Sequence, residues 1–337
     1  MTKRFFLWLG KAAVAGCLAF LLLSLFCFFY SNVPVHYANP TGSTEYRWEA
    51  GRFYSRFTEG FALGKTNNDG FNNLRDYTPG EQIDVLLMGS SHMEAFNVAQ
   101  DKSTAAVLNR LFDGKKYVYS IGTAGHTLPY CVKHLGSALD TYVPAQYVLL
   151  ETASLDLTPA DMEGALDGSL ADIPSYTGGL VGLMQRVPLL RLLYTKYFKN
   201  TLAFGGDPEE ASAGAVDAAS QERYEATLAA FIGHIGLESA AHGVQAVIVF
   251  NPAVGIADDG SLYTITRPEQ LAAFQALCAE NGVRFLDLTD VYMRAYREQH
   301  LLPSGFSNTA PARGHLNAVG HRLIAETVYD TITAWEG

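Results

Sequence analysis

One short stretch, residues 83–91, most constrains what this chain can fold into. It begins with apolar, mostly branched residues and ends in Gly89-Ser90-Ser91. A short apolar run of this composition is typical of a central parallel strand that is buried on both faces. Because ligands of open α/β sheets bind just beyond the carboxyl ends of such strands, Ser91 is a candidate nucleophile. The alternative is that the serine only caps the following helix.

The rest of the chain alternates strands with helices. Further strands are expected at 116–121, 146–151, 244–250 and 283–288, with helices at 103–112, 129–139, 221–242, 268–280 and 317–335. This alternation indicates parallel βαβ units. We therefore predict a flavodoxin-like three-layer α/β/α domain with a central parallel sheet.

That domain is expected to cover residues 83–337, with an insertion at about 152–220 that caps the strand ends. Within the insertion, residues 183–198 are amphipathic and basic. A helix lying on a membrane surface is an alternative interpretation of this segment.

The N-terminus is expected to cross a membrane once. Lys3, Arg4 and Lys11 precede an uncharged run over 12–30, close to the ~20 residues that span a bilayer as a helix. Basic residues on this side place the N-terminus in the cytoplasm and the remaining chain outside. A cleaved signal peptide is the alternative, but its apolar core is usually shorter. We predict that residues 1–30 form a cytoplasmic tip and a single-pass anchor in the cell membrane.

Residues 31–82 form a polar segment that is unusually rich in aromatic side chains. Turn signals at 39–42 and 67–70 punctuate it. The density of aromatic residues favours an ordered extracytoplasmic lead-in packed on the main domain over a free linker.

Charge and cysteine content exclude some classes of protein. The net charge is −10 with no basic stripe, which argues against a nucleic-acid partner and against broad attraction to an anionic polymer or lipid surface. Four cysteines are too few for a disulfide scaffold. Cys131 and Cys278 lie outside the apolar N-terminal run; they either pair or, as we favour, remain buried thiols.

A histidine near the C-terminus supplies what a serine nucleophile needs. Serine is a poor nucleophile at neutral pH and requires a base to take its proton. His315 lies in the loop before the last predicted helix, within Gly314-His315-Leu316-Asn317. Imidazole has a suitable pKa for this role. Only the fold can bring His315 to Ser91.

Together these motifs resemble the SGNH/GDSL hydrolases and acyltransferases over about residues 83–337. The matching blocks are strand-Gly-Ser-Ser, the glycine turn at 122–125 after the second strand, and His-Leu-Asn-x-x-Gly-His from His315. The arrangement is similar to a membrane-anchored branch that includes alginate O-acetyltransferases and the D-alanine transfer proteins of teichoic acid. The resemblance implies Ser91 as the nucleophile and His315 as the base. It also implies an oxyanion hole from the Ser91 backbone N–H and Gly125.

The chain departs from that family at two positions. The family carries an Asp three residues before the histidine, where this chain has Ala312. Asp287 or Asp290, near the end of the last predicted strand, are candidates to orient His315, although both also suit an ordinary strand end. A backbone carbonyl or a water is a further alternative. Leu155 stands where the family's oxyanion Asn aligns.

Three other polar residues are candidates for the pocket around Ser91. Ser90 and His92 flank it in sequence, and Asn251 follows another predicted strand. Each has a plainer interpretation: a polar residue at a helix N-terminus for Ser90 and His92, and a turn for Asn251.

The remaining histidines do not indicate a metal or a cofactor. His126 is interpreted as a loop residue, with a catalytic role as the alternative, and His321 as a residue that faces the helix surface or caps a neighbour. No carboxylate or cysteine joins the histidines at ligand spacing. The glycine turn at 122–125 lacks a third glycine and a downstream ribose-binding acid, so it is not a dinucleotide site.

The sequence thus predicts serine-dependent acyl transfer or ester hydrolysis outside the membrane, through an acyl-enzyme on Ser91. The expected partner is an acylated cell-envelope polymer or glycan, with an acyl-donor protein of the membrane if the reaction is a transfer. The alternative function is a catalytically inactive binding or assembly protein of the cell envelope on the same fold, which the missing Asp at position 312 favours. The motifs do not distinguish a hydrolase from a transferase.

Overall fold

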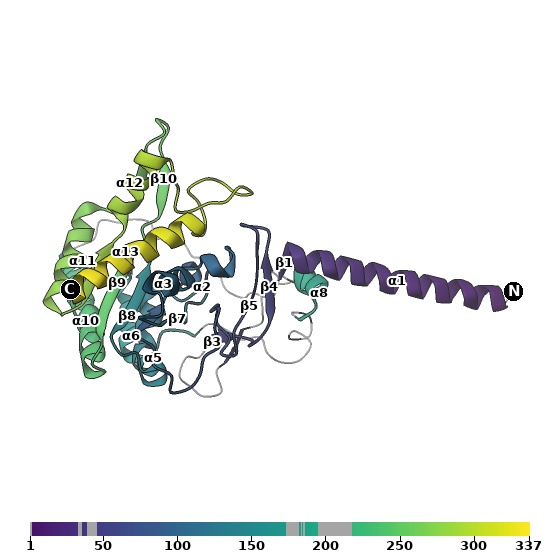
Figure 1. The fold of residues 1–337 in the computed structure, drawn as a ribbon, viewed down its shortest axis with the longest axis horizontal. Coiled ribbons are helices and arrows are strands. Elements are labelled where there is room, and N and C mark those ends of the chain that lie inside the picture. Colours follow the sequence, from purple (N-terminus) through teal and green to yellow (C-terminus); the bar gives the residue numbers. More distant parts are fainter. Residues whose placement is uncertain are drawn as a thin grey trace.

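The computed structural model describes residues 2–32, 36–38, 46–172, 182, 184, 186–194 and 218–337. Its centre is a five-stranded sheet in the order β12-β9-β8-β6-β7, in which every neighbouring pair is parallel (Figure 1). The strands are β6 (Val85–Met88), β7 (Val118–Ser120), β8 (Tyr147–Thr152), β9 (Gln245–Phe250) and β12 (Arg284–Asp287). This confirms the predicted flavodoxin-like architecture. The chain adds β7 on one side of β6 and then β8, β9 and β12 on the other side, so the switch point of the sheet lies between β6 and β8.

Two apolar layers cover the sheet, because successive residues of each strand point to opposite faces. Leu86 and Met88 of β6 lie in one core cluster, and Val85 and Leu87 lie in the other. The first layer is formed by α4 (Leu128–Lys133), α5 (Leu135–Tyr142), α6 (Pro159–Asp167), α10 (Ala218–Ala241) and α11 (Pro268–Glu280). The second is formed by α3 (Thr104–Phe112), α12 (Thr289–Gln299) and α13 (Ala318–Glu336).

Some local predictions were wrong. The helix expected at 129–139 is two helices, α4 and α5, which meet at His134. Helix α12 was not expected, nor was the hairpin of β10 (Val254–Ile256) and β11 (Leu262–Thr264). Within the predicted insertion, α6 packs against α4 and α10, and α8 (Pro188–Leu193) packs against the N-terminal helix. Most other residues of the insertion lie outside the described part of the chain. The prediction that the insertion caps the strand ends therefore falls on residues that the structure does not describe.

Helix α1 (Thr2–Tyr30) is longer than the predicted apolar run and projects away from the domain (Figure 1). Its segment Lys3–Tyr30 is long and apolar enough to cross a membrane, and a signal sequence meets the same description. Strand β1 (Ser31–Asn32) follows it directly and pairs with β4 (Phe53–Arg56). The last turn of α1 is tied to the same hairpin, because Ser55 Oγ donates to the Phe28 carbonyl.

The lead-in forms small antiparallel units on the main domain. Strand β4 pairs with β5 (Ala62–Lys65), and β2 (His36–Ala38) pairs with β3 (Tyr46–Trp48). A short helix α2 (Ser91–Glu94) and a 3₁₀ turn, η1 (Gln100–Lys102), complete the described elements.

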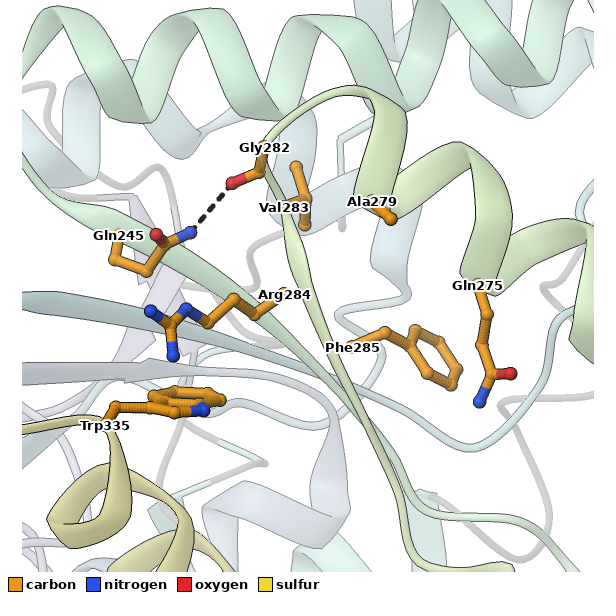
Figure 2. Close-up of a pocket in the computed structure, with 8 residues that line it drawn as sticks. All are labelled: Gln245, Gln275, Ala279, Gly282, Val283, Arg284, Phe285 and Trp335. Atoms are coloured by element: carbon orange, nitrogen blue, oxygen red, sulfur yellow. Dashed lines mark hydrogen bonds between the residues drawn. The ribbon is translucent and has the colours of Figure 1, made fainter.

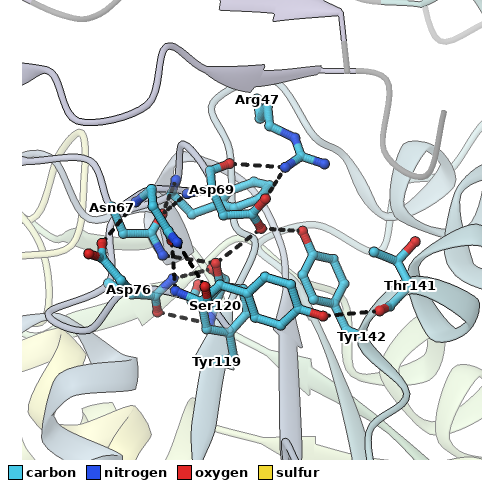
Figure 3. Close-up of polar contacts among 12 residues, drawn as sticks. Arg47, Asn67, Asp69, Asp76, Tyr119, Ser120, Thr141 and Tyr142 are labelled. Carbon is cyan, nitrogen blue, oxygen red and sulfur yellow. Dashed lines mark hydrogen bonds and ion pairs between the residues drawn. The ribbon is translucent and has the colours of Figure 1, made fainter. Parts of the chain in front are cut away.

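Polar side chains fasten the lead-in to the sheet (Figure 3). Asp69 pairs with Arg47 and accepts hydrogen bonds from Tyr119 Oη at 3.1 Å and Tyr142 Oη at 2.6 Å. The Asn73 side chain exchanges two hydrogen bonds with the backbone of Ser120, at the end of β7. Carboxylate and amide groups that are hydrogen-bonded in this way fix one arrangement of neighbouring segments.

Candidate active site

Ser91 lies at the switch point of the sheet, at the first position of α2. Its neighbour Ser90 is the N-cap, whose Oγ accepts a hydrogen bond from the His92 backbone N–H at 3.3 Å. The capping role considered for the serine therefore belongs to Ser90, which leaves the Ser91 hydroxyl available for another contact.

That contact is with His315. Ser91 Oγ and His315 Nε2 are 3.0 Å apart, and the other ring nitrogen, Nδ1, lies 2.7 Å from Glu59 Oε2. Because a carboxylate only accepts hydrogen bonds, Nδ1 carries the proton and Nε2 is free to accept from the serine hydroxyl. The three side chains have the geometry of a serine–histidine–carboxylate triad.

Glu59 comes from the N-terminal part of the chain and is held in place by residues from the C-terminal part. It lies in the loop between β4 and β5, and its second oxygen, Oε1, accepts the His315 backbone N–H at 2.6 Å. The Asn308 side chain accepts from the Gly60 N–H at 3.0 Å. Gly314 has φ +78°, and a Cβ there would overlap Glu59 Oε1. A glycine before His315 therefore admits the carboxylate.

The prediction that Asp287 or Asp290 orients His315 was wrong. Asp287 Oδ1 accepts from the Thr289 backbone N–H at 2.9 Å and from its hydroxyl at 2.6 Å, and Asp290 lies in the first turn of α12. Glu59 occupies the position at Nδ1. Sequence reasoning missed it because Glu59 lies outside every motif block, in a hairpin loop of the lead-in.

Burial of the His315 ring lowers its pKa below the usual value. The charge and hydrogen bond of Glu59 raise it again in part, while nearby His92 and Arg56 lower it further. The net lowering keeps the ring neutral at pH 7, which is the form that accepts a proton.

A second buried network supports the turn after β6. Glu151, at the end of β8, is 1% exposed. Its Oε2 accepts from the Ser90 backbone N–H at 3.1 Å and from the Ser90 hydroxyl at 3.0 Å. Its Oε1 contacts His92 Nδ1 at 3.2 Å and Asn251 Nδ2 at 3.2 Å. Burial raises the pKa of Glu151, but these hydrogen bonds outweigh it and the net pKa is lowered.

The structure thus joins Ser90, His92 and Asn251 through Glu151, a residue that sequence reasoning did not single out. The Ser90 N–H is used in this network and is not a donor for an oxyanion. The His92 ring stands perpendicular to that of His315, with ring centres 5.8 Å apart. The network fixes the backbone from which Ser91 projects.

The two predicted oxyanion donors lie on neighbouring strand ends. Among the residues that the structure describes, neither the Ser91 nor the Gly125 backbone N–H donates to another group. Gly125 is exposed, with φ +90°. Its loop is fixed by hydrogen bonds from Thr123 N–H to the Gly89 carbonyl and from Ala124 N–H to Glu94 Oε1. Their role as an oxyanion hole remains a prediction.

The other histidines and the cysteines that the sequence analysis discussed are packed within the fold. His321 was expected to face the helix surface or to cap a neighbour; it is instead 1% exposed, and its Nδ1 lies 2.9 Å from Thr104 Oγ1. Burial lowers its pKa to about 3. His126 stacks on Tyr130. Cys131 and Cys278 are buried free thiols, as favoured from the sequence. Within the described part of the chain, no group of three potential ligands could hold a metal ion.

A cavity of about 230 Å³ adjoins the site beyond the carboxyl ends of β6 and β8. Ser90, Glu151, Thr152 and His126 contribute to its wall. A larger cavity of about 560 Å³ lies where β9 and β12 begin, at the opposite edge of the sheet (Figure 2). There the Arg284 guanidinium stacks 3.8 Å above Trp335. This larger cavity is therefore distant from Ser91, which follows the carboxyl end of β6.

The fold and the site therefore define a parallel α/β protein with a Ser91–His315–Glu59 triad at its switch point. No protein-family model matches the chain, and no curated protein matches it. Solved structures similar to it include esterases and acyltransferases.

The esterase EstA from Pseudoalteromonas sp. is 14% identical, with a TM-score of 0.37 over 75% of this chain and 98% of that one. The acetyl xylan esterase AlAXEase is 12% identical, with a TM-score of 0.40 over 75% and 100%. The salicylyl-acyltransferase SsfX3 from a tetracycline biosynthetic pathway is 16% identical, with a TM-score of 0.40 over 77% and 57%. Likeness at this level says nothing of activity, so the site is interpreted from its own geometry.

Proposed function

We propose that this protein is a serine esterase or O-acyltransferase that forms an acyl-enzyme on Ser91. The observation that carries the proposal is the unbroken chain of contacts from Ser91 Oγ through the His315 ring to Glu59. A serine, a neutral imidazole and a carboxylate in this order are what nucleophilic catalysis by a hydroxyl requires.

In the first half of the reaction, His315 Nε2 takes the Ser91 proton as Oγ attacks the carbonyl carbon of an ester or thioester. The negative charge that develops on the carbonyl oxygen is stabilised by the Ser91 and Gly125 N–H groups, each worth roughly 10²–10³ in rate where such donors have been measured. Glu59 stabilises the imidazolium. The imidazolium then protonates the leaving alcohol or thiol, and the acyl group remains on Ser91.

In the second half, water or a sugar hydroxyl attacks the acyl-enzyme. His315 takes the proton of the attacking group as its oxygen bonds to the acyl carbon, and gives that proton to Ser91 Oγ as the bond between Oγ and the acyl carbon breaks. Water gives hydrolysis and a sugar hydroxyl gives acyl transfer. Both outcomes use the same three side chains.

The proposed substrate is an acylated glycan or polymer of the cell envelope, outside the membrane. Helix α1 has the length and apolar character of a single-pass anchor. Lys3 and Arg4 precede its apolar run, which favours a cytoplasmic N-terminus. A membrane protein that delivers the acyl group is the expected partner if the reaction is a transfer.

The alternative of an inactive binding protein rested on the absence of an Asp at position 312. Glu59 supplies a carboxylate to the same ring nitrogen at 2.7 Å. Glu59 therefore compensates for the missing Asp at position 312, which was the feature that favoured an inactive protein.

A fluorophosphonate probe tests the proposal, because it phosphonylates only an activated serine. We expect the full-length protein in detergent to be labelled, with the adduct mapped to Ser91 by peptide mass spectrometry. Ser91→Ala should abolish labelling. Ser261→Ala, which removes an exposed hydroxyl bonded only to Asp259, should not change it. A folded protein that is not labelled, or is labelled at Ser90, contradicts the proposal.

A further inference from the structure

Two arginines near the membrane end of the domain form no ion pair with any described residue. Arg56 Nε and Arg191 Nη1 are buried atoms without a hydrogen-bond partner among the described residues. Arg47 and Arg75 of the lead-in differ in that each pairs with a carboxylate, although Arg47 Nε is also a buried atom without a partner among the described residues. A buried guanidinium N–H without an acceptor is costly, so such a group is expected to have a ligand.

The two arginines belong to packed neighbouring elements. Arg56 is on β4, where it pairs with Ser31 of β1 on one side and with Ala62 of β5 on the other. Helix α8, which carries Arg191, packs against β1 and the end of α1 (Figure 1). Burial and the charge of Arg56 together lower the pKa of Arg191 to about 10. Like charges on adjoining elements repel each other, and an anion bound by both would relieve this repulsion.

The pair also adjoins the active site. Arg56 is three residues before Glu59, on the strand that leads into its loop. The charge of Arg56 acts on the His315 ring and on Glu94, which are both beside Ser91. An anion bound by Arg56 would therefore lie on the hairpin whose loop carries Glu59, the partner of His315.

We propose that Arg56 and Arg191 bind a phosphate group, carried either by the substrate of the Ser91 site or by a membrane lipid. Two guanidinium forks can donate to several oxygens of one phosphate at once, which matches its charge and its tetrahedral shape better than a single carboxylate. That the phosphate belongs to a substrate rests on the proposed acyl-transfer function. The binding of phosphate itself does not.

The phosphate has two possible sources. Exposed Phe53 and Phe61, at 65% and 64%, flank Arg56 on the hairpin next to the end of α1. Aromatic side chains at the end of a membrane helix are typical of the bilayer interface, where lipid headgroup phosphates lie. The other source is a water-soluble phosphate ester of an envelope polymer.

Equilibrium dialysis with ³²P-labelled inorganic phosphate, on the full-length protein in detergent, tests the site directly. We expect saturable binding that weakens about 10- to 100-fold in Arg56→Gln and in Arg191→Gln, because each removes hydrogen bonds to a charged ligand. Arg56→Lys should retain part of the affinity. The control is Arg322→Gln, whose exposed side chain pairs with Glu326 on α13; it should bind as the native protein does.

Competition separates the sources. Displacement by glycerol 1-phosphate indicates a soluble phosphate ester, and displacement only by nanodiscs of phosphatidylglycerol, not phosphatidylcholine, indicates a lipid headgroup. Absence of binding, or equal binding by both Gln variants and the native protein, overturns the proposal even if the fluorophosphonate labels Ser91. If phosphate binding depends on the arginines but Ser91 is not labelled, the proposed function is wrong and the phosphate site at Arg56 and Arg191 stands.

Discussion

Replacing Glu59 with Gln should nearly abolish the reactivity of Ser91 while leaving the shape of the site intact. The carboxylate accepts two hydrogen bonds, from His315 Nδ1 at 2.7 Å and from the His315 backbone N–H at 2.6 Å. A Gln side chain has only one oxygen, so one of its two contacts must become a donor.

Both arrangements of the amide are unfavourable. If the oxygen accepts the backbone N–H, the amide NH₂ donates to Nδ1 and moves the ring proton to Nε2, which then cannot accept from Ser91 Oγ. If the amide is reversed, its NH₂ faces the backbone N–H, and two donors oppose each other. The charge that stabilises the imidazolium is lost in either case. Changing the corresponding carboxylate of a serine protease to an amide costs about 10⁴ in rate.

We therefore expect a loss of about 10³- to 10⁴-fold in labelling rate for Glu59→Gln, equivalent to roughly 4–5 kcal/mol of activation free energy. The measurement is the second-order rate of fluorophosphonate labelling at pH 8, with circular dichroism to confirm folding. Glu49→Gln and Asp287→Asn are matched controls, because these carboxylates contact Arg52 and Thr289 and not the triad. A rate for folded Glu59→Gln within threefold of the native rate would refute the assignment of Glu59.

Three further outcomes are expected. Because the pKa of His315 is lowered from its usual value near 6.5, the labelling rate should fall to half its value at pH 8 only below pH 6.5; a midpoint above pH 6.5 contradicts this. Burial raises the pKa of Glu94 from 4.5 to about 7, so the native protein should lose up to about 3 kcal/mol of stability as pH rises from 4.5 through 7. Melting temperatures of Glu94→Gln, which lacks this titration, should not show that loss. Finally, a Cβ at Gly122 would lie 2.5 Å from Met93 Cβ, so Gly122→Ala should cost about 1–3 kcal/mol and lower the melting temperature; an unchanged value would show that the loop moves freely.

The elements that the sequence predicted well are those whose signals are local. Strand β9 is a run of apolar, branched residues buried on both sides, and such runs have few other stable placements. Helix α11 has the expected bounds, Pro268–Glu280, because proline is favoured in a first turn. The start of α13 follows from Asn317, whose side chain accepts from two backbone N–H groups.

The missed elements lack such signals. Helix α12 buries only Tyr292 and Ala295, and most of its other residues are polar, so its apolar pattern is too sparse to stand out. The break between α4 and α5 at His134 involves no proline or glycine at that position. Packing on the sheet, and not local preference, decides where these helices begin and end.

The same contrast divides the site. Ser91 and His315 each belong to a motif and could be proposed from the residues beside them. Glu59 and Glu151 act through contacts with residues far away in the chain, so no local pattern marks their partners. Glu151 offered a weak cue, because a carboxylate ends a strand that is otherwise almost wholly apolar. Glu59 offered none beyond its place in a turn.

The geometry around His315 explains why the carboxylate arrives from the lead-in. Ala312 is 3% exposed and lies in the apolar core cluster beside α13, so this position supplies no carboxylate to His315. Gly314, which precedes His315, has no Cβ, and Glu59 Oε1 occupies the space that a Cβ would take. Its hairpin is in turn tied to α1 through Phe28 and Ser55. In the proposed mechanism, activation of Ser91 therefore depends on docking of the segment that follows the apolar helix, so the lead-in is part of the candidate site and not a spacer in front of it.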